Sequence, residues 1–576
     1  MVRSLLLMVT TTMSLLVACT SGALGAGLPL GTGNLTEARH SQALAPGVTY
    51  TDIVRGTGSN DEYFAVDVDF TLNRDEAAQT AARITAEGNQ AQVISVDDHA
   101  PDSPSPGPAA YMVRVGRYAS SAEARPIADR LVREGYPRVH VDYSGDDGTL
   151  TGGPWRLHLI DIDPRRFAGS VQPVLATGIV PGRETVSSID LRTSALAGVN
   201  GGYFVIGSSD GTPGDLAGIS MISGDLVSEA VNGRTDLLMP QPSGRGAFVA
   251  PLSTALSARA ADGARHVVNG RNRALGLIRS CGEAGDRPTE RPLHDVTCTN
   301  PSELVQFTPA FGSVSDPSSQ IEAVLDGRGR VVTLRPPGGP IPPSGSVLGG
   351  TGDGAAWLRA HAIPGSKLRV SVAITTSGGS KPCDRRRRGG APRPSRADRK
   401  RAHRDPRRPG NQGCGERKNS GRGPAEGAET EPVNVGPTLG IVNGGPRLLS
   451  GGAPMIDAAA EGFTHPDDPE FYYRFGVRRN PRTLAGVTPA GHLLLLAVDG
   501  RAPGYSNGLS FAEEASVLRS LGASDALNLD GGGSTTMALG PALVTRPSDP
   551  TGERPVGDSI VVLPQRDARA RAGRSG

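Results

Sequence analysis

Apolar and polar residues follow the same pattern twice between residues 63 and 143. The run EYFAVDVDF alternates like a half-buried strand, RDEAAQTAARITAEG has helical spacing, and AQVISVDD alternates again. After the Pro/Ser-rich run APDSPSPGPA, the pattern returns as AYMVRVGRYA, SSAEARPIADRLVREG and RVHVDY. Ser120 or Ser121 suits the start of the second helix, and Gly135 suits its end. This order of elements predicts a split βαβ arrangement.

The second copy of the pattern is similar to the SPOR domain family. The resemblance rests on MVRVGRYASSAEARPIADRLVREGYPRVHV, where a strand, a Gly-Arg-Tyr turn and an alanine-rich helix follow one another. It implies a ferredoxin-like βαββαβ module over residues 61–149 that binds peptidoglycan glycan strands. A ferredoxin-like module without affinity for glycan is the alternative.

A larger β-rich, mixed α/β domain is expected over residues 150–565. Short apolar runs separated by Gly, Pro and Asp predict many strands up to about residue 379. Later, AGHLLLLAVDG predicts a buried strand, and SFAEEASVLRSLGAS predicts a helix capped by Ser510 and ended at Gly522. The strand of DALNLDGGGSTTMALG follows this helix. Such a crossover would bring Asp499 and Asp530 to one sheet edge. The fold class is therefore α+β.

The chain begins with MVRSLLLMVTTTMSLLVAC, which predicts a secretory signal peptide within residues 1–26. LVAC fits a lipoprotein box with a lipid on Cys19, and ALGAG fits ordinary cleavage. Both interpretations place the mature protein outside the cytoplasm, secreted or attached to the cell envelope. No further transmembrane span is expected. Residues 27–60 are expected to form a linker with short strands, and residues 566–576 a disordered tail.

The segment 381–432 contains no aliphatic or aromatic core residue apart from Ala, Pro and Cys, and it is rich in Arg. It cannot bury a core, so we expect a disordered basic insertion. One interpretation is an arm that grips an anionic polymer. The other is an unselected insertion, or a stretch read in a shifted frame. A nucleic-acid partner is not expected, because aromatic residues for base stacking are absent from the segment.

Composition and cysteine positions add two expectations. The net charge of +2 provides no global attraction for nucleic acid, and the 78 Gly and 47 Pro indicate a loop-rich globular protein. Export permits disulfides, and Cys281 and Cys298 flank a polar loop that suits one. Cys383 and Cys414 pair or remain free. No cluster has metal-ligand spacing, so we expect neither a metal nor another cofactor.

Four runs share one pattern, in which an apolar strand ends in a short polar residue followed by glycine. The polar residues are Asn200, Asn443, Asp499 and Asp530. Each run alone is an ordinary hairpin signal, but four in one domain indicate a site where backbone approaches a ligand. Arg482 in RRNPRTLAG and the amides of GGGST suit a phosphate, and the carboxylates suit acid, base or nucleophile chemistry.

These motifs resemble the phosphodiester glycosidase domain family, which includes N-acetylglucosamine-1-phosphodiester alpha-N-acetylglucosaminidase. GVNGGYF, VNGGPRLL, NPRTLAGVTPAGHLLLLAVDGR, SLGASDALNLDGGGSTTMAL and GERPVGDSIVV occur here in the family order. The resemblance covers roughly residues 150–565. It implies a hydrolase that cleaves a sugar-1-phosphodiester, releasing the sugar and leaving a phosphomonoester. The insertion at 381–432 departs from the family pattern.

The resemblance carries these motif positions over, and from their residue chemistry we expect Asp499, Asp530 and Arg482 to be catalytic. Arg482 would hold the phosphate with the GGGST loop, and the two aspartates would divide the acid and the base or nucleophile roles. The implied substrate-binding residues are Asn200, Gly201, Gly202, Asn443, Gly444, Gly445, Thr483, Gly531, Gly532, Ser534 and Thr535.

Two functions are therefore predicted. The first is an exported hydrolase of carbohydrate phosphodiesters that acts at or near the bacterial cell wall. The second is a non-catalytic glycan-binding protein that keeps a degenerate glycosidase fold. The intact Asp and Arg positions favour the first function, and the insertion favours the second.

Overall fold

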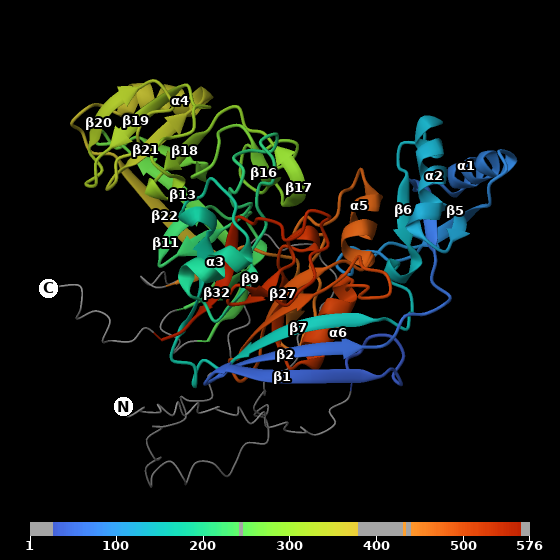
Figure 1. Ribbon diagram of the computed structural model, residues 1–576. Helices are drawn as coiled ribbons and strands as arrows, with labels where there is room; N and C mark the ends of the chain where they lie inside the picture. Colours follow the sequence, from blue (N-terminus) through green and yellow to red (C-terminus); the bar gives the residue numbers. More distant parts are fainter. Residues whose placement is uncertain (1–26, 241–245, 378–429, 434–438, 566–576) are drawn as a thin grey trace, which may run out of the picture.

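The computed structural model describes residues 27–240, 246–377, 430–433 and 439–565 (Figure 1). The predicted signal peptide, the predicted tail, Cys19, Cys383 and Cys414 lie outside the described residues, as does most of the basic segment 381–432.

The N-terminal module has its strands and helices in the predicted order. Its four strands form an antiparallel sheet in the order β4-β5-β3-β6, and the two helices cover one face of it. Ser120 caps the second helix by accepting a hydrogen bond from the amide of Glu123, and Gly135 follows that helix with a φ of 90°. The elements are β3 (Phe64–Thr71), α1 (Arg74–Ala86), β4 (Ala91–Val96), β5 (Ala110–Tyr118), α2 (Ser121–Arg133) and β6 (His140–Tyr143).

The other face of this sheet packs against the C-terminal domain. Phe70, Val96 and Met112 form an apolar cluster with Tyr473 and Val477. Because both faces are covered in part, the module is docked on the larger domain. Figure 1 shows this arrangement, with β6 beside α5.

An eight-stranded sheet forms the centre of the larger domain, and its middle strands are buried on both faces. Successive residues of Leu493–Val498 alternate between two apolar clusters, one beneath α6 (Phe511–Ser520) and one shared with neighbouring sheets. This explains the continuous apolar run LLLLAV. In sheet order the strands are β1 (Glu37–Ala45), β2 (Val48–Arg55), β7 (Trp155–Ile162), β28 (Leu493–Val498), β27 (Arg482–Val487), β29 (Asp525–Asn528), β25 (Arg447–Ser450) and β26 (Ala453–Pro454).

β1 and β2 lie in the stretch expected to form a linker with short strands, and they form one edge of this sheet. β2 pairs with β7 along its full length, and its Val48 and Ile53 are completely buried. The apolar spacing of β2 is irregular, and a partner strand a hundred residues away decides its conformation.

The crossover around α6 places the predicted aspartates at one edge of the sheet. α6 starts at Ser510, which forms a capping box with Glu513, as the sequence predicted. β28 and β29 are each antiparallel to β27, which lies between them. Both therefore end at the edge where β27 begins with Arg482, and Asp499 and Asp530 follow shortly after these ends.

A five-stranded sheet and a second eight-stranded sheet complete the core around the central sheet. The first consists of β31 (Ala542–Leu543), β30 (Met537–Leu539), β9 (Ala197–Asn200), β32 (Asp558–Leu563) and β8 (Ser170–Leu175), and α3 (Val186–Thr193) contacts it. The second consists of β11 (Asp225–Ser228), β10 (Ser220–Ile222), β24 (Gly440–Val442), β12 (Arg234–Met239), β13 (Phe248–Arg259), β22 (Arg369–Ser377) and β23 (Thr430–Pro432), with β14 (Arg265–Val268) pairing β13.

The strands on either side of the basic segment are in place. β22 pairs with β13, and β24 lies between β10 and β12. The described end of the segment, β23, pairs with β22.

A separate lobe projects from this region (Figure 1). It carries a further five-stranded sheet, the helix α4 and a two-stranded hairpin. The elements are β15 (Gly270–Arg271), β18 (Leu304–Phe307), β21 (Ser346–Gly350), β19 (Ile321–Leu325), β20 (Val331–Arg335), α4 (Gly352–His361), and the hairpin β16 (Ile278–Cys281) and β17 (Leu293–Cys298).

Short helical turns connect these strands. They are the 3-10 turns Ser144–Asp146, Ala176–Gly178, Pro309–Phe311 and Gly532–Ser534, the short helix α5 (Pro469–Tyr472) and the π-helix Tyr473–Val477 that continues it. Across the described ranges, no helix is long and apolar enough to cross a membrane.

A buried carboxyl on α3 predicts a pH-dependent stability. Asp190 is 1% exposed, and neither carboxylate oxygen has a hydrogen-bond partner in the described part of the chain. Burial, with a smaller contribution from Glu553, raises the pKa of Asp190 to about 8. The unfolded chain has a pKa of about 3.9 at this residue. Between these values the folded state holds a proton that the unfolded state has lost, so the free energy of unfolding falls as pH rises.

We therefore expect Asp190→Asn to raise the melting temperature at pH 8 and to leave it nearly unchanged at pH 4. Thermal unfolding across this pH range measures the difference, with the exposed Asp129→Asn as control. An equal effect of Asp190→Asn at both pH values would contradict a protonated buried carboxyl.

Candidate active site

A cavity of about 500 Å³ opens at the sheet edge where β29 ends, and we call it the Asp530 cavity. Loops after β28 and β29, the hairpin β16–β17, α5 and the start of β6 surround it. Its polar and aromatic lining includes His140, Tyr203, Arg279, His294, Asp295, Asp468, Glu470, Phe471, Arg474, Phe475, Asn480, Arg482, Arg501, Asp530, Gly531, Gly532, Gly533 and Arg554.

Asp530 lies at the centre of this edge, half-buried after β29. Its Oδ1 accepts a hydrogen bond of 2.9 Å from the amide of Gly531. Burial raises the pKa of Asp530 to about 6, although Ser534 and Arg554 oppose the rise. A carboxyl with a pKa close to neutral can exchange a proton at physiological pH, which suits acid or base chemistry.

The three glycines after Asp530 make room for two arginines. Gly532 has a φ of 60°, and a Cβ there would lie 3.3 Å from the guanidinium of Arg501. A Cβ on Gly533 would collide with the ion pair between Arg554 and Asp549. The run GGGST therefore lets two guanidinium groups lie directly against the backbone.

Both arginines are held by planar partners. Arg501 donates from Nε and Nη2 to Oδ1 of Asn480, at 3.1 and 2.8 Å. Arg554 donates from Nε and Nη2 to Asp549, at 2.7 and 3.0 Å. Two fixed guanidinium groups against one glycine loop form a site that suits an oxyanion such as phosphate.

Arg482 also lines the cavity, but its guanidinium is buried and bonded to backbone inside the protein. It donates to the carbonyls of Leu509 and Phe475, at 2.9 and 2.6 Å, and lies 2.8 Å from Glu514. The side chain is 2% exposed. Burial raises the pKa of Glu514 to about 8, although Arg482 opposes the rise. Arg482 thus supports the floor of the cavity.

Asn200 lies behind Asp530, fully buried. Its Nδ2 donates to the carbonyl of Asp530 at 2.7 Å, and its Oδ1 accepts from Thr483 Oγ1 at 2.6 Å and from the amide of Thr536 at 3.0 Å. Asn200 and Thr483 therefore hold the backbone of the Asp530 loop and have no free group for a ligand.

Asn443 plays a similar part around the neighbouring GGY turn. Its Oδ1 accepts from the amide of Tyr203 at 2.9 Å, and a Cβ on Gly202 would collide with its side chain. Asp558 accepts from the amide of Gly202 at 3.0 Å and occupies the space beside Gly201. The glycines at 201 and 202 are thus required by close packing of polar side chains.

Asp499 lies apart from the Asp530 cavity. Its Oδ1 accepts from the amide of Arg546 at 2.8 Å, and its Oδ2 is 3.4 Å from Nε2 of His158. The residue is 1% exposed. Asp499 and Asp530 share a sheet edge, but β27 separates the strands that carry them.

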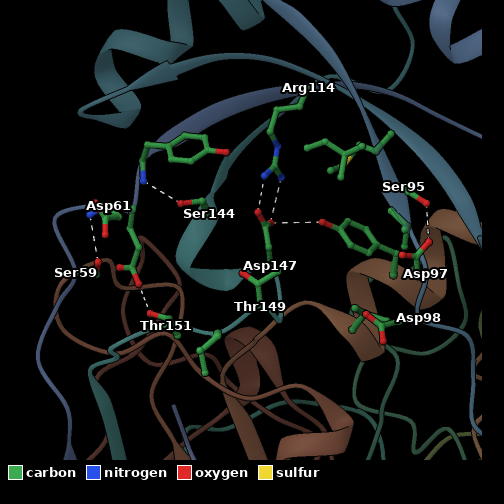
Figure 2. Close-up of a pocket in the computed structure, with 18 of the residues that line it drawn as sticks. Ser59, Asp61, Ser95, Asp97, Asp98, Arg114, Ser144, Asp147, Thr149 and Thr151 are labelled. Carbon is green, nitrogen blue, oxygen red and sulfur yellow. Dashed lines mark hydrogen bonds and ion pairs between the residues drawn. The ribbon is translucent and has the colours of Figure 1, made fainter. Parts of the chain in front are cut away.

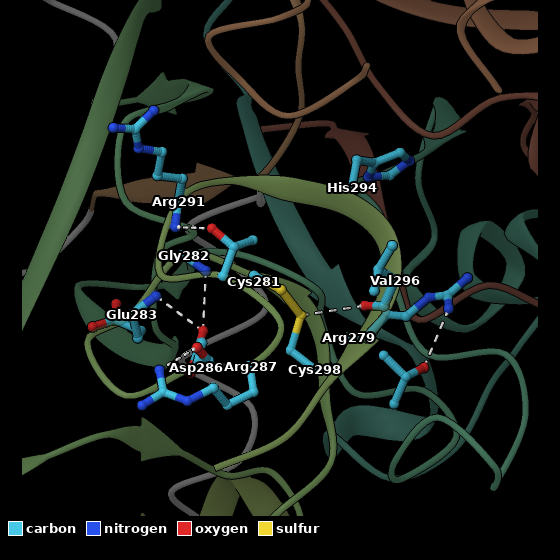
Figure 3. The surroundings of a disulfide bond; sticks show 12 residues. Arg279, Cys281, Gly282, Glu283, Asp286, Arg287, Arg291, His294, Val296 and Cys298 are labelled. Atoms are coloured by element: carbon cyan, nitrogen blue, oxygen red, sulfur yellow. Dashed lines mark hydrogen bonds between the residues drawn. A yellow bond between two sulfur atoms is a disulfide. The ribbon is translucent and has the colours of Figure 1, made fainter. Parts of the chain in front are cut away.

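The opposite wall of the cavity is the hairpin β16–β17. The predicted disulfide joins Cys281 to Cys298 across it, as Figure 3 shows. Arg279 and Asp295 form an ion pair on this hairpin. Asp295 and Arg501 both adopt left-handed backbone, with φ of 61° and 52°. This conformation is uncommon for residues other than glycine and is found preferentially at functional sites.

The predicted residues thus fall into two groups. Arg482, Asp530, Gly531 and Gly532 line the cavity. The second group supports or adjoins the first without lining the cavity and comprises Asn200, Gly201, Gly202, Asn443, Gly444, Gly445, Thr483, Asp499, Ser534 and Thr535.

Sequence reasoning missed Asn480, Arg501, Arg554 and the hairpin residues Arg279 and Asp295. Arg501 and Arg554 directly follow or lie within motifs that resemble the family, VDGR and GERPVGD. A positively charged side chain within a glycine-containing motif was the sequence signal that could have indicated an anion site. Asp295 lies in the polar loop between the cysteines, which was considered only for the disulfide.

A second cavity, of about 680 Å³, lies between the N-terminal module and the larger domain. We call it the interdomain cavity. Figure 2 shows hydroxyl and carboxyl side chains around it, with Arg114 paired to Asp147. Its lining includes Ser59, Asp61, Glu62, Tyr63, Ser95, Asp97, Asp98, Met112, Arg114, Ser144, Asp147, Thr149, Thr151 and Tyr473.

Within the ranges that the structure describes, no group of His, Cys, Asp and Glu is arranged to hold a metal ion.

Comparisons with known proteins point to a family for the C-terminal part of the chain. The family model for phosphodiester glycosidase matches residues 409–563, which include the Asp530 loop, Arg501 and Arg554. Over these residues the chain is similar to the phosphodiester glycosidase family. The same loops therefore carry the family match and the charged end of the cavity.

Solved structures support the architecture. A Burkholderia pseudomallei protein, named as an exported protein, is 32% identical with a TM-score of 0.78, and the match covers 94% of this chain and 99% of that chain. A hypothetical protein from Synechocystis is 17% identical (TM-score 0.48, 92% and 79% covered). Zebrafish N-acetylglucosamine-1-phosphodiester alpha-N-acetylglucosaminidase is 13% identical (TM-score 0.30, 82% and 88% covered). The TM-scores of the Synechocystis and zebrafish structures are too low for an inference about the site of this chain. Among curated proteins, none matches this chain.

The arrangement of Gly533 predicts how the anion site fails. Gly533→Ala places a methyl group where the Arg554–Asp549 pair lies, so the guanidinium must move away from the loop. Because the colliding atoms are ends of flexible side chains, the fold survives. We expect binding of inorganic phosphate, measured by calorimetry, to weaken about tenfold, the loss of roughly one charge-assisted hydrogen bond.

Gly58→Ala is the matched control, because a Cβ there meets open space. Phosphate binding by Gly533→Ala that equals that of the unaltered protein would show that the position of Arg554 is irrelevant to the site.

Proposed function

We propose that this protein is an exported hydrolase that cleaves sugar-1-phosphodiester bonds of the N-acetylglucosamine-1-phosphodiester kind, at or near the bacterial cell wall. One observation carries the proposal. A carboxyl with a pKa of about 6, Asp530, stands beside two fixed arginines on a glycine loop in a single cavity. An acid/base group next to an oxyanion site is what this hydrolysis requires.

In the proposed reaction, Arg501 and Arg554 hold the phosphate. Water attacks the anomeric carbon and gives its proton to the carboxylate of Asp530. The bond between the anomeric carbon and the phosphate oxygen breaks, the sugar is released, and the phosphomonoester leaves with the electron pair. This leaving group is a stable anion, so cations assist it and a proton donor is unnecessary. Asp530 accordingly acts in its ionised form as the base.

The remaining predicted residues receive supporting roles in this proposal. Arg482 supports the phosphate end from below, and Asn200 and Thr483 fix the carbonyl of Asp530. Asp499 positions the segment that begins at Arg546. These assignments follow from the hydrogen bonds of each side chain.

The N-terminal module is proposed as a SPOR-like, ferredoxin-like unit that binds peptidoglycan glycan. The interdomain cavity supports this role, because its hydroxyls and carboxylates can bond sugar hydroxyls. The exported neighbour and the predicted signal peptide support a location outside the cytoplasm, with or without a lipid on Cys19.

The alternative is a non-catalytic glycan-binding protein whose basic segment has damaged the fold. The strands on either side of that segment pair normally in their sheet, which favours the hydrolase.

Release of N-acetylglucosamine from a synthetic N-acetylglucosamine-1-phosphate methyl diester tests the proposal. We expect turnover by residues 27–576 and by a copy that lacks residues 381–429. Turnover by the shortened copy alone would mark the segment as inhibitory. Absence of turnover from both, with the fold verified, would refute the hydrolase and favour the binding protein.

The base role predicts a pH profile. Since Asp530 must be ionised, kcat/KM should rise with pH and level off above a midpoint near 6. Asp530→Asn should lower kcat at least about a hundredfold at pH 7 and abolish this limb. A rate that falls as pH rises through 6 would instead assign Asp530 as the acid.

Removal of the Asp295 charge should move the midpoint of this pH profile in a defined direction. This charge raises the pKa of Asp530 from across the cavity. Asp295→Asn should therefore shift the ascending limb to lower pH, by a fraction of a pH unit because solvent screens an exposed carboxylate. Asp549→Asn does not serve as a control, because it releases Arg554. The exposed Asp129→Asn should leave the midpoint unchanged.

A further inference from the structure

The Asp530 cavity is built from both parts of the chain. Most of its lining belongs to the C-terminal domain, but His140 belongs to the N-terminal module, at the start of β6. The imidazole is 45% exposed, and its Nε2 lies 3.6 Å from Oε1 of Glu470. A substrate that fills the cavity therefore meets a side chain of the module.

Ion pairs fix this junction. Arg138 donates from Nη1 to Asp468 and to Glu470, each at 2.7 Å. Arg474 donates to Glu470 at 2.5 Å and to Asp142 at 3.0 Å. Glu470 is thus held from both sides, and its side chain is 8% exposed. The position of His140 relative to the wall formed by α5 is set by these contacts.

The chemistry of this wall differs from that of the phosphate end. Asp468, Glu470 and His140 carry hydrogen-bonding groups, and Phe471 lies beside them in the lining. Burial and the nearby Arg474 lower the pKa of His140, so the imidazole is neutral at pH 7 and can both donate and accept. Neutral and charged hydrogen-bonding side chains at this wall suit the hydroxyls of a sugar.

We propose that His140 is a specificity-determining residue that contacts a carbohydrate chain attached to the second oxygen of the phosphodiester. The N-terminal module and the hydrolase domain then form one substrate site. This inference rests on the proposed hydrolase function and deepens it. It names the alcohol part of the substrate as a glycan and gives the module a place at the cleavage site itself.

Two probes test it with the protein comprising residues 27–576. Both contain N-acetylglucosamine-1-phosphate, one esterified to methanol and the other to a primary hydroxyl of an N-acetylglucosamine tetrasaccharide. We expect the unaltered protein to prefer the tetrasaccharide probe in kcat/KM. His140→Ala should reduce that preference at least tenfold, mainly through KM, and His140→Gln should restore part of it.

Arg133→Ala, an exposed change on α2 of the same module, is the control and should keep the preference. Equal losses on both probes would show that His140 merely supports the wall and would overturn the inference. An unchanged preference would overturn it as well. If the unaltered protein turns over neither probe, the hydrolase proposal fails separately. Calorimetric binding of the same two probes then decides the role of His140 by the same ratio.

Discussion

The side-chain amide of Asn200 is the contact on which the geometry of the site depends. It joins three segments that are far apart in the sequence: the end of β9, the start of β27 through Thr483, and the loop that carries Asp530. All of these groups are removed from water, so each unmade hydrogen bond would carry a full desolvation cost, about 1–3 kcal/mol. Satisfying them together leaves one position for the carbonyl of Asp530, and hence one direction for its carboxyl.

Charges in this protein are arranged in two ways around that fixed point. Behind the cavity, Arg482 donates hydrogen bonds to two backbone carbonyls and lies beside Glu514. In front, Arg501 and Arg554 are each held by one planar partner. A buried cation bonded to backbone carbonyls fixes the surrounding loops, whereas a cation with donors directed into the cavity can meet an anion. Three arginines close in space therefore contribute differently.

Local signals made part of this structure predictable. The helix at Phe511–Ser520 follows from its spacing and capping box, and the buried strand at Leu493–Val498 follows from its apolar run. The positions of Asn200 and Asn443 were visible as polar strand ends. The hydrogen-bond partners of these two side chains were not predictable. A short amide at a strand end can bond a ligand or the protein backbone, and its burial in the fold decides which.

The remaining parts of the cavity depend on contacts between distant segments. Asp295 and Arg501 occupy loops whose left-handed backbone is stabilised by the surrounding fold and has no glycine signal in the sequence. His140 enters only because one face of the module sheet is covered by the larger domain. β1 and β2 became strands because β7 offered a free edge. The positions of these residues are set by tertiary contacts, so no local sequence pattern predicts them.

The pairing of β22 with β23 also has a consequence for protein engineering. Ser377 lies opposite Thr430, so the chain leaves the sheet and returns to it at almost the same point. The free-energy cost of closing a flexible loop grows only with the logarithm of its length, about 0.6 kcal/mol for each doubling. Evolution or a designer can therefore exchange the intervening stretch for a short turn, a reporter domain or an affinity tag. This junction is therefore a suitable insertion site, and it lies on a different sheet from the one whose edge carries Asp530.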